Sequence, residues 1–107
     1  MRAALLFLAF LLAPAAAAAQ EPRPWCEAGP LNAAERTVCD TPELSRLDAR
    51  LAEVYGRLRS ADPGQDDWLR GERDGCGADI ACLRAAYVDR IRVLRLRRDF
   101  GLDVDGA

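Results

Sequence analysis

The chain has 107 residues, a formal net charge of −2 at neutral pH and no histidine. The missing histidine excludes Ser-His-Asp and Cys-His catalytic groups as well as histidine-bearing metal sites. The length allows one domain with a modest core and leaves little chain for the walls of a catalytic cleft. We therefore expect neither an enzyme nor a bound cofactor or metal ion.

The first 19 residues have the pattern of a secretory signal peptide. Arg2 precedes an apolar run over 3–13, and the small-residue stretch PAAAAAQ suits cleavage near Ala19. A membrane anchor is the alternative, but the apolar run is shorter than the roughly 20 residues that a spanning helix needs. No cysteine stands at the cleavage site, so we expect no lipid anchor. The sequence thus predicts a periplasmic or secreted protein of 88 residues with a net charge of −3 and no stable membrane anchor.

The mature part begins with an irregular arm and a short helix. Residues 20–30 are rich in proline and glycine, so we expect an extended arm without regular structure, held by Cys26. Asn32 and Glu35 have the spacing of a variant capping box, which predicts a short helix over residues 33–40.

A long helix is predicted in TPELSRLDARLAEVYGRLRSADPG, residues 41–64. Thr41 is a candidate N-cap, Pro42 suits the first helical position, and Pro63-Gly64 would end the helix. Five apolar residues at alternating spacings of three and four form one stripe that must pack against another element. These residues are Leu44, Leu47, Leu51, Val54 and Leu58.

Two further helical stretches follow. Residues 65–74 have a weaker helix pattern because Gly71 lies among them. The last helix is expected to begin after Asp79 as N-cap and to run to about Phe100, with Gly101 as its stop. Its apolar stripe consists of Ile80, Leu83, Tyr87, Ile91 and Leu94.

The fold class is predicted to be all-α, because helical periodicity occurs throughout and alternation with a period of two does not. We expect a small antiparallel helical hairpin or bundle stapled by two disulfides, with a single domain over 20–101 and a flexible tail at 102–107. Tyr55, Trp68 and Tyr87 are expected in the core or at its edge.

All four cysteines follow the signal peptide: Cys26, Cys39, Cys76 and Cys82. An even number of cysteines in a small exported chain is typical of two disulfides. A zinc site or a redox-active pair would normally use the spacing C-x-x-C, which is missing. Four cysteines allow three connectivities; we favour the local pairs Cys26–Cys39 and Cys76–Cys82, and the other two stay open.

Two charged segments are candidate contacts with a partner. The stretch ADPGQDD, residues 61–67, brings Asp62, Asp66 and Asp67 together around a turn, and such a loop would suit a cationic partner. Alternatively, Asp66 and Asp67 only favour the N-terminus of the next helix. The stretch DRIRVLRLRR, residues 89–98, would suit phosphate-rich partners, but arginines also favour a helix C-terminus and cover apolar surface, and export argues against nucleic acid.

The segments CEAGPLNAAERTVCDTPELSRLDARLAEVY and WLRGERDGCGADIACLRAAYVDRI resemble the LprI-type lysozyme inhibitor family of secreted bacterial domains. The resemblance covers about residues 25–95 and implies an all-helical domain of the cell envelope with two disulfides and no catalytic residue. Besides the four cysteines, the matching positions are Glu35, Arg36, Leu47, Asp48, Tyr55, Trp68, Arg73, Asp74, Leu83 and Tyr87. The namesake is a lipoprotein, whereas this signal peptide lacks the lipidation cysteine.

The resemblance implies an exported protein that binds c-type lysozyme and protects the cell envelope. Such lysozymes are strongly basic, so an acidic domain would be steered towards them, with Asp62, Asp66 and Asp67 as the candidate contacts. The alternative is a non-inhibitory envelope module that binds another protein. That alternative predicts exposed apolar residues on the last helix, such as Val88, Val93 or Leu96, in a continuous patch.

Overall fold

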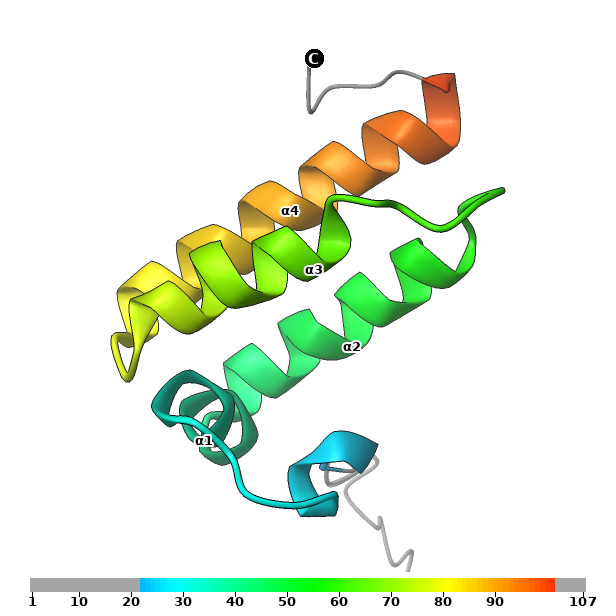
Figure 1. Ribbon diagram of the computed structural model, residues 1–107. Coiled ribbons are helices and arrows are strands. Elements are labelled where there is room, and N and C mark those ends of the chain that lie inside the picture. Colours follow the sequence, from blue (N-terminus) through cyan, green and yellow to red (C-terminus); the bar gives the residue numbers. More distant parts are fainter. Residues whose placement is uncertain (1–21, 102–107) are drawn as a thin grey trace, which may run out of the picture.

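The computed structural model describes residues 22–101, and this part of the chain is all-α, as predicted (Figure 1). No strand occurs within residues 22–101. The signal peptide predicted at 1–19 and the tail predicted at 102–107 lie outside the described residues. A search of the described helices finds none with the length and apolar character needed to cross a bilayer.

The N-terminal arm, residues 23–31, folds back onto the helices. Pro24–Glu27 form a 3₁₀ turn, η2, which corrects the expectation that the arm has no regular structure. Pro24 stands at the first position of this turn, where its fixed φ angle suits a helical start and its missing N–H costs nothing. Cys26 in the turn is bonded to Cys39, so the arm is fastened to the next element, as expected.

The first α-helix, α1, spans Ala33–Asp40 and begins with the predicted capping box. Asn32 Oδ1 accepts a hydrogen bond from the N–H of Glu35 at 2.8 Å, and Glu35 Oε1 accepts one from the N–H of Asn32 at 3.0 Å. Two N–H groups that the helix leaves unpaired are thereby satisfied.

The two long helices are α2, Pro42–Gly56, and α4, Ile80–Phe100. Helix α2 ends about two turns before the expected Pro63-Gly64, at a glycine, which is a poor helix former. Helix α4 has the expected limits: Asp79 Oδ1 accepts from the N–H of Cys82 at 3.0 Å, and Gly101 ends the helix with a φ of 63°. Glycine suits this left-handed conformation because it has no Cβ.

Residues 65–76, here called the return segment, connect the long helices. They comprise α3 (Gln65–Asp67), a π-helical stretch η3 (Trp68–Arg73) and a 3₁₀ turn η4 (Asp74–Cys76). The disulfide Cys76–Cys82 joins the end of this segment to α4, as expected. Figure 1 shows the return segment running opposite to both α2 and α4.

The long helices α2 and α4 consequently run in the same direction (Figure 1). Their contacts agree: Arg84 near the start of α4 donates to Glu43 near the start of α2 at 2.9 Å, and Tyr87 one turn further on donates to Asp48. The expected antiparallel hairpin of the two long helices is therefore not confirmed. The arrangement is a bundle in which neighbours along the chain are antiparallel.

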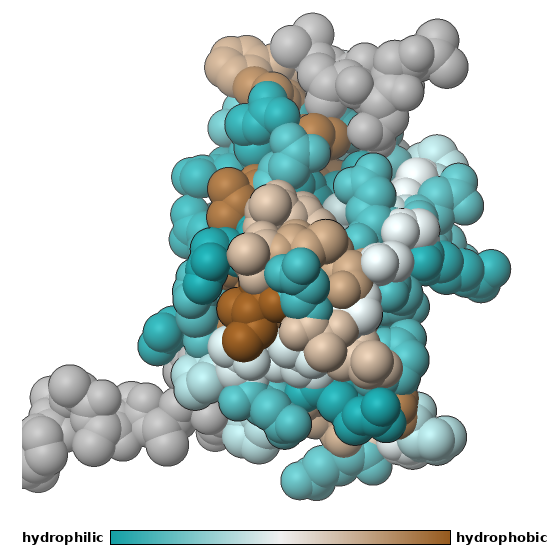
Figure 2. All heavy atoms as spheres, turned by 90° about the vertical axis from the view of Figure 1, so that its left-hand side faces the viewer, coloured by the Kyte–Doolittle hydropathy of each residue, from teal (hydrophilic) through white to brown (hydrophobic). Residues whose placement is uncertain are grey.

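The core lies between α1, α2, α4 and the return segment. Trp68 packs its ring edge-on against Tyr87, with the ring centroids 5.2 Å apart. The predicted apolar stripes supply most of the core, but Ile80 is 42% exposed. Figure 2 shows apolar side chains gathered on the face where α4 begins. The buried apolar residues are Ala34, Val38, Leu44, Leu51, Val54, Trp68, Leu83, Tyr87, Ile91 and Leu94.

Both disulfides should stabilise the fold, and the bridge of the arm should contribute more. Replacing Cys26 and Cys39 by serine is expected to lower the free energy of unfolding by about 3 kcal/mol, because the bridge closes a loop with a separation of 13 residues. The same change at Cys76 and Cys82, with a separation of 6, should cost about 2 kcal/mol. Urea unfolding followed by circular dichroism measures both; a larger loss at Cys76 and Cys82 would contradict this order.

Candidate functional site

A groove of about 810 Å³ lies between the arm, α2 and the return segment, and we call it the acidic groove. Trp25 of the arm, Tyr55 of α2 and Leu69 of the return segment give it apolar walls. Four carboxylates and two arginines are also among its lining residues. They are Glu35, Asp48, Asp62 and Asp66, and Arg23 and Arg73. Carboxylates therefore outnumber arginines among the lining residues.

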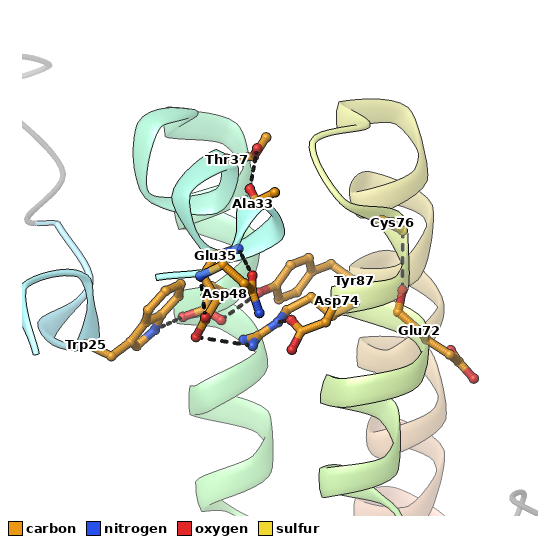
Figure 3. Close-up of polar contacts among 11 residues, drawn as sticks. Trp25, Ala33, Glu35, Thr37, Asp48, Glu72, Asp74, Cys76 and Tyr87 are labelled. Carbon is orange, nitrogen blue, oxygen red and sulfur yellow. Dashed lines mark hydrogen bonds and ion pairs between the residues drawn. The ribbon is translucent and has the colours of Figure 1, made fainter. Parts of the chain in front are cut away.

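The floor of the acidic groove is organised around Asp48, whose residue is 7% exposed. Its carboxylate accepts hydrogen bonds from Trp25 Nε1 at 2.9 Å and from Tyr87 Oη at 2.8 Å (Figure 3). A third hydrogen bond comes from Arg23 Nε at 2.8 Å. Burial, together with the Asp48 carboxylate, raises the pKa of Tyr87 above its ordinary value, so the hydroxyl stays a donor. One carboxylate therefore ties the arm and α4 to α2.

Arg73 forms the adjoining wall of the groove. Its Nε donates to Asp74 Oδ1 at 2.9 Å, its Nη2 lies 3.7 Å from Glu35 Oε2, and its guanidinium lies 5.6 Å from the ring centroid of Trp25. Burial alone would lower the pKa of Arg73, but Asp74 and Tyr87 raise it above the ordinary value, so the side chain stays charged. The Arg73–Asp74 pair is thus mostly buried and fixes the position of the arm through Trp25.

The three carboxylates of the acidic loop have different environments. Asp62 is buried and forms ion pairs with Arg90 and Arg97 of α4, and its Oδ1 accepts from the N–H of Gly64 at 3.1 Å. Burial alone would raise the pKa of Asp62, but the Gly64 N–H and the two guanidinium groups lower it below the ordinary value. Asp62 therefore holds the loop against α4 and presents no carboxylate to solvent.

Asp66 and Asp67 are exposed in α3, at the start of the return segment. The Asp66 carboxylate lies 3.5 Å from Arg70 Nη2, with both side chains largely in solvent, and it borders the acidic groove. Such an exposed pair contributes little to stability and leaves the carboxylate accessible. The structure thus brings only Asp66 of the predicted set to an accessible position on the groove.

The arm's part in this site was not predicted from the sequence. Arg23 and Trp25 lie in a proline-rich stretch, and their partner Asp48 is 25 and 23 residues away. A tryptophan next to a cysteine in such a stretch was the available signal, because a large aromatic ring is rarely left in solvent when a bridge fixes its neighbour.

The acidic groove suits recognition of a cationic group. Asp48 is already satisfied by three donors, whereas Asp66 is accessible. Half-buried Glu35 has the Asn32 N–H and Arg73 as partners, but each carboxylate oxygen has two lone pairs, so both Asp66 and Glu35 can accept from a guest. Among residues 22–101 no group of three potential ligands is arranged to hold a metal ion.

Comparison with known proteins gave no match to a family model, to a curated protein or to a solved structure.

Proposed function

We propose that the protein is a lysozyme-inhibitor-like protein of the cell envelope that binds a basic c-type lysozyme. The resemblance of residues 26–55 and 68–91 to LprI-type inhibitors suggests this class of partner. The two disulfides are compatible with an oxidising compartment outside the cytoplasm. The observation that carries the proposal is the acidic groove with Asp66 accessible at its border.

The groove would receive an arginine or lysine side chain that protrudes from the lysozyme surface. Trp25 and Tyr55 would contact the aliphatic stem of such a side chain, and Glu35 and Asp66 would accept hydrogen bonds from its charged end. The bridge at Cys26 and the hydrogen bonds at Asp48 hold the groove in place before binding, which reduces the entropy lost on association. Net charge would add electrostatic steering between the two proteins.

The residues expected to contact lysozyme differ in part from those expected from the sequence. Asp66 and Asp67 remain, and Glu35 joins them, whereas Asp62 acts through its ion pairs with α4. The variant D66N/D67N should inhibit lysozyme about tenfold less well at low ionic strength, because two accessible charges are lost. The difference should shrink at physiological salt, where exposed charges are screened. A lysozyme turnover assay with the oxidised protein measures both effects.

A matched control is the variant E53Q/D89N, which also loses two negative charges. Glu53 and Asp89 are exposed and form ion pairs with Arg57 and Arg92, away from the acidic groove. This variant should inhibit nearly as well as the natural protein. The proposal fails if the folded, oxidised protein does not inhibit at a large molar excess, and the groove is excluded as the contact if both variants inhibit equally.

A second candidate function is a non-inhibitory module that binds another envelope protein. Val88 on α4 is 52% exposed, which favours this reading, and it lines a groove together with Leu47 and Leu96. Val93 is half-buried and does not line that groove. The lysozyme assay separates the two functions, because the module would leave lysozyme turnover unchanged.

A further inference from the structure

The five arginines of residues 89–98 have different surroundings, and one of them, Arg98, pairs with the adjacent Asp99 at 2.7 Å. Arg90 and Arg97 turn inward to Asp62. Arg92 and Arg95 are exposed and line a second groove, of about 400 Å³, between α2 and α4. Interaction with the helix C-terminus or with Asp62 therefore explains only some of these arginines.

This second groove, here called the arginine groove, has an apolar floor and a basic rim. Leu47 of α2 and Val88, Ile91 and Leu96 of α4 supply the floor. Arg50 of α2 and Arg92 and Arg95 of α4 supply the rim, with Asp99 at one end. Exposed Arg46 lies one turn before Arg50 on α2.

The rim arginines carry charge that their neighbours neutralise only in part. No ion pair within 4.0 Å joins Arg50 or Arg95 to a carboxylate of residues 22–101, although the charge of Arg95 helps to lower the pKa of nearby Asp99. Arg92 pairs with Asp89 at 2.5 Å, but both side chains are more than half exposed, so the pair is weak. The rim therefore offers guanidinium groups that are free to contact an anion.

The charge of the molecule is segregated between its two grooves. Residues 22–101 contain fourteen arginines and fourteen carboxylates, so this part of the chain is neutral as a whole. Carboxylates predominate in the acidic groove, whereas three arginines face one aspartate in the arginine groove. This separation of charge gives residues 22–101 a preferred orientation in the field of a charged surface.

We propose that the arginine groove docks the protein onto the surface of an anionic phospholipid bilayer. Guanidinium groups bind phosphate with two parallel hydrogen bonds, and the apolar floor suits the acyl-chain region just below the headgroups. Val88, at 52% exposed, is the floor residue that is most accessible to that region. Among the residues that line this groove none is aromatic, so it lacks the stacking surface that a single-stranded nucleic acid would use.

Docking in this way leaves the acidic groove accessible. Helix α2 contributes Leu47 and Arg50 to the arginine groove but Asp48, Leu51, Ala52 and Tyr55 to the acidic groove, so the two grooves use different faces of the same helix. The inference does not depend on what the acidic groove binds.

Vesicle sedimentation tests this inference. The protein is exported by an expression host, and intact mass establishes that residues 1–19 have been removed, because an apolar leader would itself bind lipid. It should sediment with vesicles of phosphatidylglycerol and phosphatidylcholine in equal parts, and not with pure phosphatidylcholine. Binding should weaken steeply with salt, since the attraction is to exposed lipid charge.

Two pairs of variants locate the contact. R50Q/R95Q should weaken binding to the anionic vesicles about 25-fold, at about fivefold for each arginine near the surface. The control R36Q/R70Q removes the same charge from exposed positions outside the arginine groove and should change binding less than threefold. The variant V88S, at an exposed position, should also weaken binding, whereas it would not affect a purely electrostatic contact.

The inference is wrong if the folded protein does not sediment with anionic vesicles at low salt. It is also wrong if R50Q/R95Q and R36Q/R70Q bind equally well. Binding of a single-stranded oligonucleotide through Arg50 and Arg95, without vesicle binding, would overturn it in favour of another polyanion.

Discussion

Replacing Asp62 by alanine is expected to lower the free energy of unfolding by about 3–5 kcal/mol, because Arg90 would be left buried without its carboxylate. The Arg90 side chain is 5% exposed and the Asp62 side chain 1% exposed, so water cannot replace the lost partner. Gly64 would lose its acceptor as well. Urea unfolding followed by circular dichroism measures this loss.

The milder variant R97Q tests the same ion pairs if the alanine variant does not fold. Arg97 is 21% exposed and Arg90 would still pair with Asp62, so the expected cost is about 1 kcal/mol. Equal costs for R97Q and the alanine variant would contradict a central role for the buried Arg90–Asp62 pair.

The Asp62 ion pairs also predict a pH dependence of stability. The pKa of Asp62 is lower in the folded protein than its ordinary value of 3.8, which is that of the unfolded chain. The resulting stabilisation is fully present above pH 3.8 and is lost as the pH falls towards the folded pKa. Stability should therefore fall more steeply below this pH in the natural protein than in the variant D62N, which has no titrating group at this position.

Replacing Asp48 by alanine should lower the free energy of unfolding by about 3–4 kcal/mol, since three donors lose their acceptor together. The hydroxyl of fully buried Tyr87 would find no water, and Trp25 and Arg23 would lose what holds them against α2. Urea unfolding gives the free energy, and tryptophan fluorescence in the folded state should report the release of Trp25.

The variant Y87F is the matched comparison for Asp48. It removes one of the three hydrogen bonds and leaves Trp25 and Arg23 on the carboxylate, so about 1 kcal/mol is expected, without release of the arm. If Y87F were as costly as removal of Asp48, the stability would derive from the tyrosine contact and not from the fastening of the arm.

Local chemistry made several elements of this fold predictable. The capping box of Asn32 and Glu35 fixes the start of α1, and Asp79 and Gly101 mark the ends of α4. In each case the residues that interact are at most four positions apart, so their order in the chain determines the contact. Apolar spacing likewise identified most of the core, from Leu44 to Leu94.

Contacts between distant residues were not predictable in the same way. Asp62 meets Arg90 and Arg97 across 28 and 35 residues, and without those partners it is one of several loop carboxylates. Asp48 was noted only as a position that matches the LprI-type pattern, yet it is an acceptor for the arm and for α4. The direction of α4 relative to α2 depended on the return segment, whose π-helical stretch has no signal in residue propensities.

The order of the disulfides along the chain affects how the protein matures. Both bridges join consecutive cysteines: Cys26 to Cys39, then Cys76 to Cys82. A chain that enters an oxidising compartment N-terminus first presents the first two cysteines to each other before the third arrives, and short loops close most readily. In such a chain, pairing in order of emergence would give the native bridges directly, without an enzyme that reshuffles mispaired cysteines.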